Sequence, residues 1–242
     1  MNNLYLEKSN STLDLIAGKE SQTFCAEDTQ SLEPILAAPI PAWKRTVDLL
    51  GASLAILLLF PLFILSILII KIVSPGPVLF KQIRTGYLGK SFVIWKFRTM
   101  HLNADSGLHA TQIRNEIKND LELKKVENDP RIFPFGNFLR NSCIDELPQL
   151  INVIRGEMSL VGPRPELPYA VDEFQRWHCA RLDVLPGMTG LWQINGKNST
   201  TFTEMIRYDI EYGQQLSFTL EIKILLLTIP AILKQVWQSM RN

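Results

Sequence analysis

The chain has 242 residues, a formal net charge of +1, 46% hydrophobic residues and 20% charged residues. This composition excludes a wholly disordered chain, a collagen-like fibre and a strongly basic nucleic-acid-binding protein. The three cysteines are scattered and show no CxxC spacing, which argues against a zinc ribbon and against a disulfide-rich scaffold.

Residues 1–40 differ in composition from the rest of the chain. They carry two basic and six acidic side chains, a net charge of −4, and are rich in Ser, Thr, Asn and Gln. They lack the basic start, apolar stretch and cleavage site of a signal peptide. We therefore expect residues 1–40 to form a disordered acidic extension.

A long apolar run follows this segment. Between Asp48 and Lys71 lie 22 uncharged residues, enough for a helix of roughly 33 Å that could cross a bilayer. Two observations argue against a straight span: Pro61 in the middle removes a backbone hydrogen bond, and both flanks are basic, which would place one basic cluster on the wrong side of the membrane. From the residues alone, a helix that enters the membrane, breaks at Phe60 and Pro61 and returns competes with a straight span.

Residues 78–99 predict a β-hairpin. The segments VLFKQIR and SFVIWKFRT are rich in β-branched and aromatic residues, and they flank a turn that contains two glycines. Alternation along the second strand places Lys96 and Arg98 on one face together with Ile94. The pattern leaves open whether these cations are solvated charges on an edge strand or groups that meet an anion.

The remaining chain is predicted to be mostly helical. Residues 101–128 contain a thin apolar stripe, residues 131–158 contain a broader one, and a further helix is expected near residues 169–182. The last uncharged run, residues 224–233, is too short to span a bilayer and predicts an amphipathic helix on the membrane surface.

Asp145 and Glu146 are the strongest candidates for chemistry. Pro148 is tolerated only in a first helical turn, so the acidic pair is expected at the start of a helix, where interaction with the helix dipole is the usual explanation. Here, however, Arg140 lies five residues upstream and Arg164 stands between two prolines in a GPRP sequence. Cations beside carboxylates at a helix start indicate a site for a phosphate ligand and for Mg²⁺, and a carboxylate can itself attack phosphorus.

Other candidates are weaker. The three histidines are not at metal-ligand spacing, and the chain contains no dinucleotide-binding glycine motif, P-loop or nucleophile elbow. Trp192 and the polar residues 193–198 fit either a surface that stacks on a base or sugar, or a structural loop. Cys143 is expected to be a buried apolar group, because nearby carboxylates raise the pKa of a thiol.

Several segments resemble one known family. They occur in the order KRTVDLLGA (44–52), SPGPVLFKQIRTG (74–86), WKFRTM (95–100), LRNSCIDELPQLINVIRGEMSLVGPRP (139–165), RLDVLPGMTGLWQINGKN (181–198) and RYDIEY (207–212). Together with the proline-interrupted apolar run, they resemble the bacterial sugar transferase family, the monotopic polyprenyl-phosphate phosphoglycosyl transferases, over about residues 42–235.

The resemblance implies a fold and a location. The implied fold is α+β and mostly helical, with a re-entrant membrane helix over residues 41–74 that breaks at Phe60 and Pro61. Residues 75–242 would form a cytosolic catalytic domain with a small β-hairpin and surface-lying amphipathic helices. Such a protein is monotopic and lies on the cytoplasmic face of the bacterial inner membrane. Phe60 departs from the family pattern, since relatives often carry a small residue before the proline.

The resemblance also implies a reaction: transfer of sugar 1-phosphate from a UDP-sugar to undecaprenyl phosphate with release of UMP, the first membrane step of surface polysaccharide or glycoconjugate assembly. Asp145 would attack the sugar-side phosphorus and form a covalent aspartyl intermediate. Glu146 would complete the acidic pair, and Asp145 and Glu146 would hold Mg²⁺. Four basic residues would neutralise phosphate oxygens: Arg140, Arg164, Lys96 and, as a helper, Arg98.

The expected partners are a UDP-sugar, undecaprenyl phosphate and the inner leaflet of the membrane. A homo-oligomer is left open, and nucleic acid is not an expected partner. Two alternatives remain at this stage. A hydrolase of nucleotide sugars or lipid phosphates would release UMP or phosphate without a lipid acceptor, and a non-catalytic membrane-anchored scaffold would use the same carboxylates structurally. The sequence does not identify the sugar.

Overall fold

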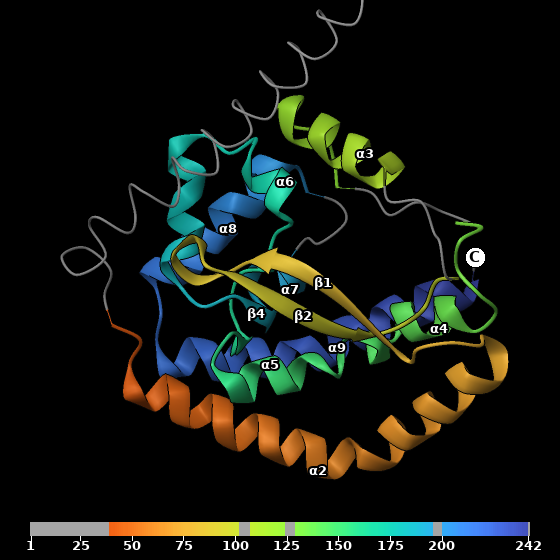
Figure 1. Ribbon diagram of the computed structural model, residues 1–242. Helices are drawn as coiled ribbons and strands as arrows, with labels where there is room; N and C mark the ends of the chain where they lie inside the picture. The colour runs from red at the N-terminus through yellow and green to blue at the C-terminus, as the bar shows by residue number, and fades with distance from the viewer. Residues whose placement is uncertain (1–38, 102–106, 124–128, 196–199, 242) are drawn as a thin grey trace, which may run out of the picture.

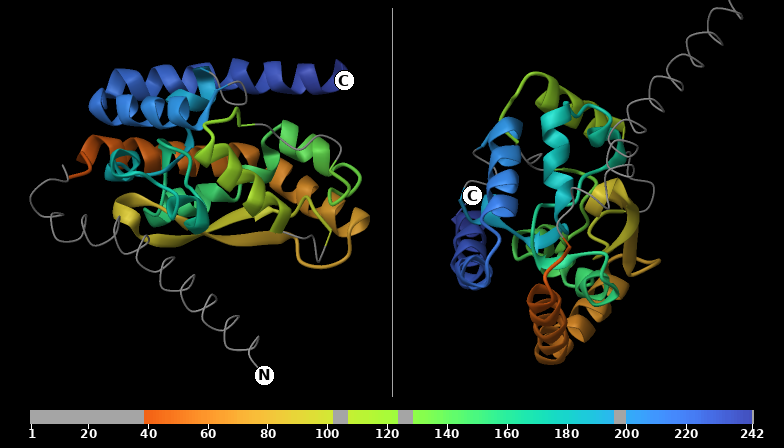
Figure 2. Two further views of the ribbon diagram at one scale, coloured as in Figure 1. Left: turned by 90° about the horizontal axis from the view of Figure 1, so that it is seen from above. Right: turned by 90° about the vertical axis from the view of Figure 1, so that its left-hand side faces the viewer.

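The structure is a computed structural model that describes residues 39–101, 107–123, 129–195 and 200–241. Within these residues the chain is mostly helical, with a two-stranded β-hairpin and a second, short two-stranded sheet. The long helix α2 (Ala42–Val73) lies along one side of the molecule (Figure 1). Seen from above, α2 lies between the hairpin and the C-terminal helix α9 (Phe218–Arg241) (Figure 2). The expected mostly helical α+β class is therefore confirmed. The extension predicted over residues 1–40 lies outside the described residues except for its last two.

Helix α2 runs from Ala42 to Val73 and contains Pro61. The prediction of a helix, a break and a second helix over residues 41–74 was wrong in one respect. The helix continues through Phe60 and Pro61, and Figure 1 shows it bent near its middle. One proline removes one hydrogen bond and crowds the preceding turn, which bends a long apolar helix without ending it.

The outer face of α2 is apolar and exposed. By length and composition the helix could cross a membrane, and little of its most apolar stretch is buried inside the molecule. Its exposed large apolar side chains are Leu49, Leu50, Leu54, Leu57, Leu58, Phe60, Ile64, Leu65, Leu68 and Ile72. The described residues therefore include one long apolar helix that is consistent with a membrane anchor.

The first turns of α2 are bound to the body of the protein by buried polar groups. Lys44 Nζ lies 2.8 Å from Glu221 Oε1 in α9 (Phe218–Arg241) and donates to the Val161 carbonyl at 3.0 Å. One turn later, Asp48 Oδ1 accepts hydrogen bonds from the Ser159 hydroxyl and the Leu160 N–H, at 2.8 and 2.9 Å. The basic flank interpreted from the sequence as a topology signal thus also joins α2 to α9 and to strand β3 (Ser159–Val161).

The last turns of α2 pack against the same body. Ile70 belongs to a buried cluster with Phe97, Phe133 and Leu139, from three separate segments of the chain. The carbonyl of Ser74, directly after the helix, accepts a hydrogen bond from the Arg98 guanidinium. Both ends of the bent helix are therefore in contact with one compact unit.

The predicted hairpin is confirmed. Strands β1 (Leu79–Thr85) and β2 (Ser91–Phe97) pair antiparallel and are joined by the 3₁₀ turn Tyr87–Gly89. The Asn152 side chain, from helix α5, binds the outer edge of β2: it accepts from Trp95 N–H at 3.2 Å and donates to the Val93 carbonyl at 2.7 Å. An amide that imitates a neighbouring strand protects this edge and fixes α5 on the hairpin.

The central helices are shorter than the periodicity predicted. The region 131–158 divides into α4 (Gly136–Asn141), the 3₁₀ turn η2 (Ile144–Glu146) and α5 (Gln149–Arg155). Two residues make this division: Cys143, whose left-handed φ of 57° separates α4 from η2, and Pro148, which directly precedes α5 and interrupts the hydrogen bonds of a continuous helix.

Two other helical predictions need the same correction. Helix α3 covers Gly107–Lys118 within the predicted 101–128. The helix expected near 169–182 is replaced by α6 (Pro168–Val171) and the 3₁₀ segment η3 (Arg176–Asp183). The spacing of apolar residues predicted where these helices lie but not how short they are.

The C-terminal part completes the body. Strands β3 and β4 (Gly187–Thr189) pair in parallel, and α7 (Leu191–Asn195) and α8 (Phe202–Gln214) follow. Helix α9 then presents an exposed apolar stripe with the spacing of one helix face, as the amphipathic pattern predicted. This stripe consists of Phe218, Ile222, Leu226, Ile229, Leu233 and Trp237.

Candidate active site

The acidic pair lies in η2, between α4 and α5. Cys143 precedes it with φ of 57°, in the left-handed region that residues other than glycine rarely adopt, and this residue redirects the chain after α4. The N–H of Glu146 donates to the Cys143 carbonyl at 3.1 Å, and α5 starts after Pro148. Asp145 and Glu146 are thus placed just before a helix start, as expected, but on a separate 3₁₀ turn.

Glu146 is held by two cations. Its Oε1 lies 2.6 Å from Lys96 Nζ, on β2, and 3.2 Å from both terminal nitrogens of Arg164, in the GPRP loop (residues 162–165). Burial lowers the pKa of Lys96, whereas the charge of Glu146 raises the pKa of Arg164. The hairpin, the acidic turn and the GPRP loop therefore meet at one carboxylate.

Asp145 has a different environment, although it is the next residue. It is 9% exposed, and no described side chain donates a hydrogen bond to its carboxylate. Burial, and then the negative charge of Glu146, raise the pKa of Asp145 to about 6 against the opposing effect of Lys96, Arg140 and Arg164. A carboxylate that is desolvated, near cations and not engaged by them is suited to nucleophilic attack.

The sequence-predicted cations divide into two groups. Lys96, Arg140 and Arg164 all act on Asp145 through their charge. Arg98 does not belong with them, because its buried guanidinium donates to the Ser74 carbonyl at the end of α2. Strand β2 ends at Phe97, so alternation placed Lys96 and Arg98 on one face but could not show that Arg98 lies beyond the strand.

Arg84, on β1, is a further cation near the site that the sequence analysis did not single out. Its guanidinium donates to Gln82 Oε1 and, at 3.1 Å, to the Pro165 carbonyl in the GPRP loop. Burial, followed by the charge of Arg164, lowers the pKa of Arg84 to about 10. The signal was present in the hairpin: pairing Thr85 with Ser91 puts Arg84 on the face that carries Lys96.

The residues present fit a magnesium ion. Mg²⁺ is usually bound through one or two carboxylates, with waters and substrate phosphates completing its shell. Asp145 and Glu146 supply such a pair. Burial and, after it, the charge of Glu146 raise the pKa of Asp145, and a bound cation would favour its ionised form. Among the described residues no group of three His, Cys, Asp or Glu side chains could hold a metal ion.

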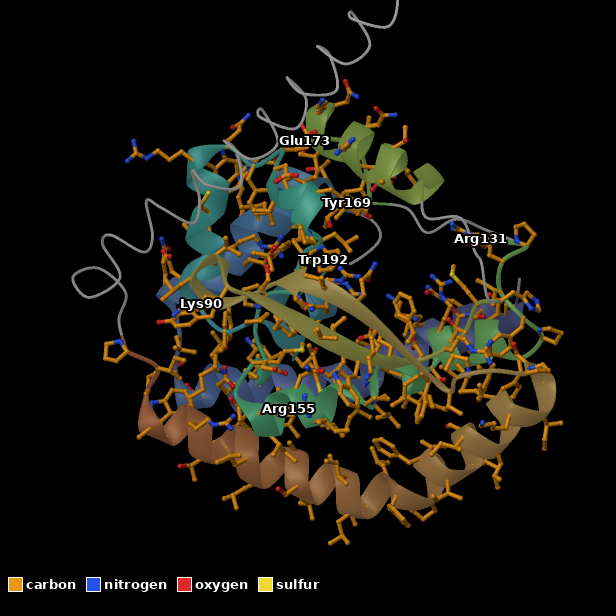
Figure 3. All side chains as sticks on the ribbon, in the orientation of Figure 1. Lys90, Arg131, Arg155, Tyr169, Glu173 and Trp192 are labelled. Atoms are coloured by element: carbon orange, nitrogen blue, oxygen red, sulfur yellow. The ribbon has the colours of Figure 1, made fainter. Side chains whose placement is uncertain are left out.

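Trp192 is structural. Its side chain, labelled in Figure 3, is buried in a cluster with Phe202, Met205 and Ile206. Its indole N–H donates to the Thr200 hydroxyl at 2.7 Å. Trp192 therefore lies in the core, on helix α7 and not in a loop, and is not part of a surface that stacks on a base or sugar. Cys143 is only partly buried, so the expectation of a buried apolar thiol was wrong.

Comparison with known proteins agrees with the motifs. Residues 40–235 match the bacterial sugar transferase family. The chain is 39% identical over 217 residues to the exopolysaccharide production protein ExoY of Rhizobium meliloti (strain 1021), which covers 88% of this chain and 93% of that protein.

Two relatives carry names that state a reaction. The chain is 39% identical over 208 residues to a UDP-glucose:undecaprenyl-phosphate glucose-1-phosphate transferase of Caulobacter vibrioides, a match that covers 83% of this chain and 73% of the relative. It is 38% identical over 195 residues to a transferase of the same name from Escherichia coli (strain K12), covering 77% of this chain and 39% of that longer protein. From the extent of these matches, the chain belongs to the bacterial sugar transferase family.

Proposed function

We propose that this protein is a phosphoglycosyl transferase that moves sugar 1-phosphate from a UDP-sugar to undecaprenyl phosphate and releases UMP. The names of the Caulobacter and Escherichia relatives support the reaction, and the name of the Rhizobium relative supports a role in exopolysaccharide production. One observation carries the chemical assignment: Asp145 is buried and close to three cations, whereas the adjacent Glu146 already occupies two of them.

In the first step an oxygen of ionised Asp145 bonds to the sugar-side phosphorus of the UDP-sugar. The bond from that phosphorus to the bridging oxygen breaks, and UMP leaves with the electron pair. The sugar phosphate is then held on the carboxylate as an acyl phosphate. Asp145 is the better nucleophile of the pair, because Glu146 Oε1 is engaged by Lys96 and Arg164.

In the second step a phosphate oxygen of undecaprenyl phosphate bonds to the same phosphorus. The bond to Asp145 breaks, the carboxylate is regenerated, and the sugar is left on a lipid diphosphate. Dividing one transfer into two displacements lets the water-soluble donor and the lipid acceptor use one site in turn.

The surrounding cations stabilise charge that develops on phosphate oxygens. Arg164 and Arg140 contribute guanidinium groups and Lys96 an ammonium group near Asp145. Asp145 and Glu146 would hold Mg²⁺, which would supply positive charge to the phosphate oxygens of the substrate. Lys96 and Arg164 both form ion pairs with the Glu146 carboxylate.

We further propose that α2 is re-entrant and keeps the protein on the cytoplasmic face of the inner membrane. A straight span would separate its two ends by the thickness of the bilayer. In support of a dip into one leaflet, Lys44 at one end and Ile70 at the other both contact the same body, while the apolar outer face between them is exposed. The acidic turn would then lie near the depth of lipid headgroups.

The topology can be tested by cysteine labelling. In a chain whose native cysteines are replaced by serine, single cysteines at Ala42 and Pro75, exposed positions at the two ends of α2, would be probed with a membrane-impermeant maleimide in intact spheroplasts and in inverted vesicles. We expect both positions to react from the cytoplasmic side alone. Labelling of the two positions from opposite sides would rule out the re-entrant arrangement.

The reaction is tested with purified protein, a panel of UDP-sugars, Mg²⁺ and undecaprenyl phosphate, with UMP release as the readout. We expect release with at least one donor, and none from Asp145→Asn. The matched control is Asp183→Asn, which changes an exposed carboxylate on η3. Turnover retained by Asp145→Asn would exclude this nucleophile, and a protein silent with every donor would favour a scaffold.

The same assay separates a hydrolase from a transferase. A hydrolase would release UMP at the full rate without undecaprenyl phosphate. A covalent transferase without acceptor releases no more than about one UMP per protein molecule before stopping, because Asp145 remains occupied. Sustained release without acceptor would therefore contradict the proposed reaction.

A further inference from the structure

Four successive backbone carbonyls, three in the GPRP loop and one in Glu166 directly after it, accept hydrogen bonds from the rest of the protein. The Pro163 carbonyl accepts from Gly187 N–H at 2.7 Å, and the Glu166 carbonyl accepts from Thr85 N–H at 2.9 Å. The two carbonyls between them accept from arginine side chains: Arg164 from Arg181 at 2.9 Å, and Pro165 from Arg84 at 3.1 Å. The donors come from β4, β1 and η3, so three separate elements fix this loop.

Arg181 is the most enclosed of these donors. Its side chain is 1% exposed, and it meets two carboxylates from different elements. Nη1 donates to Glu166 Oε1 at 2.8 Å, and Nη2 lies 2.7 Å from Asp209 Oδ2 in α8. Because a guanidinium is planar and forked, two carboxylates on fixed elements determine the direction of its remaining N–H groups.

These hydrogen bonds fix the backbone position of Arg164. With its carbonyl fixed by Arg181 and its neighbours fixed on both sides, Arg164 can adjust only through its own side chain. That side chain reaches Glu146 at 3.2 Å and acts on Asp145. Charge stabilisation in a phosphoryl transfer depends on placement within about 0.5 Å, so a shift of this backbone would be felt at the reacting phosphate.

We propose that Arg181, oriented by Asp209 and Glu166, is a positioning residue that sets where Arg164 places its guanidinium. Arg181 itself touches no reacting atom and acts on the transfer through Arg164. The inference rests on the proposed phosphoglycosyl transferase function. It adds two buried charged residues, Arg181 on η3 and Asp209 on α8, to the groups that determine the rate.

A double-mutant cycle tests this role. Arg181→Lys keeps the positive charge and removes the fork, and Arg164→Lys removes the group through which Arg181 is proposed to act. We expect Arg181→Lys to lower kcat/KM for the UDP-sugar about tenfold or more in the native chain, and less than about twofold in the Arg164→Lys background. Equal losses in the two backgrounds would overturn the proposal, since a merely structural defect would not depend on Arg164. The Kd for UDP, measured in the same four proteins, should show the same dependence without requiring turnover.

Arg45→Lys is the matched control. The Arg45 guanidinium also donates to two backbone carbonyls, those of Val153 and Ile154, but at the end of α5 instead of in the GPRP loop. Its effect should be additive with Arg164→Lys. If Arg181→Lys does not fold, Asp209→Asn, which keeps the shape of the side chain and removes the orienting charge, replaces it in the cycle with the same expected dependence on Arg164. A native protein that releases no UMP refutes the proposed function, whereas an active protein with additive variants refutes only the positioning role.

Discussion

Two regions of this protein bury charged groups, and they do so in opposite ways. At the start of α2, the ammonium of Lys44 meets the carboxylate of Glu221, and the hydroxyl of Tyr212 lies within hydrogen-bond distance of the same carboxylate and of the Val161 carbonyl. At the acidic turn, Glu146 is similarly held by cations, but Asp145 is buried without a side-chain donor among the described residues. Paired charge fixes a helix to a body, while charge left without a partner is available to a substrate.

The comparison also explains why both regions hold their shape. A buried ion pair contributes little over an apolar pair, yet removing one member leaves an uncompensated charge and is costly. The Lys44–Glu221 pair therefore makes the position of α2 specific. At the acidic turn the same cost keeps Glu146 with Lys96 and Arg164, and leaves Asp145 as the group that can change partners.

The largest expected effect is on activity at the unpaired carboxylate. Asp145→Asn should lower UMP release by at least about 10³-fold, because the nucleophile is lost. It should also raise stability at pH 7, by up to about 3 kcal/mol, since a pKa raised from 3.8 to about 6 means that ionisation of Asp145 opposes folding. Thermal melting and UMP release measured on the same preparation check both. A variant that is both inactive and less stable would contradict the view that this carboxylate is unpaired.

The next largest effect is on stability at the paired charges. Lys44→Met should destabilise the protein by about 3–5 kcal/mol, because Glu221 would be left buried without its cation. The control is Lys71→Met, an exposed lysine near the other end of the same helix, which should change stability by less than about 0.5 kcal/mol. Thermal unfolding in detergent measures both, and equal shifts would show that the buried pair is not special.

A smaller effect is expected from pH. In the proposed reaction Asp145 must lose its proton before it attacks, so its pKa of about 6 predicts that kcat/KM falls about tenfold per pH unit below that value. Glu146→Gln removes a charge that raises this pKa, so the acid limb of its remaining activity should move to lower pH. The pH profiles of native protein and variant provide the check. An acid limb that moves upward in the variant would show that Glu146 does not act on Asp145 by charge.

The smallest effect concerns the apolar surface. Leu226 on α9 is 64% exposed, so Leu226→Ser should change stability by less than about 0.5 kcal/mol while reducing sedimentation with lipid vesicles. Ile224 on the same helix is 0% exposed, and Ile224→Ser should cost about 2–5 kcal/mol. Vesicle sedimentation and thermal unfolding would be measured for both variants. Unchanged sedimentation of Leu226→Ser with vesicles would argue against contact between this stripe and the membrane.

Much of the fold followed from local chemistry. The hairpin, the long apolar helix and the amphipathic last helix each have a periodicity or composition that acts within one segment, and each is present. The errors concern where elements end. Pro61 bends α2 without breaking it, and Pro148 divides a region whose apolar spacing suggested one helix. A proline restricts the backbone in both places, and the tertiary packing around it determines the outcome.

The candidate site could be predicted only in part, because its members meet through long-range packing. Lys96, Arg140 and Arg164 stood out through charge near an acidic pair, and the structure gathers them around Asp145. Arg84 was overlooked, although the hairpin register carries its signal. The ion pair between Arg181 and Asp209 could not be predicted, since no local sequence pattern in η3 or α8 indicates that these two residues meet beside the GPRP loop.

The central claim is that Asp145 transiently carries the sugar phosphate, and rapid quenching followed by peptide mapping tests it most directly. Protein mixed with a UDP-sugar and Mg²⁺, without lipid acceptor, would be quenched and cut with trypsin. The fragment from residues 141–155 contains two carboxylates, Asp145 and Glu146. We predict that this fragment gains the mass of the sugar phosphate on Asp145 and loses it when undecaprenyl phosphate is added before the quench. An unmodified fragment in a preparation that still transfers sugar phosphate to lipid would contradict the account, because the donor and acceptor would then react without the carboxylate.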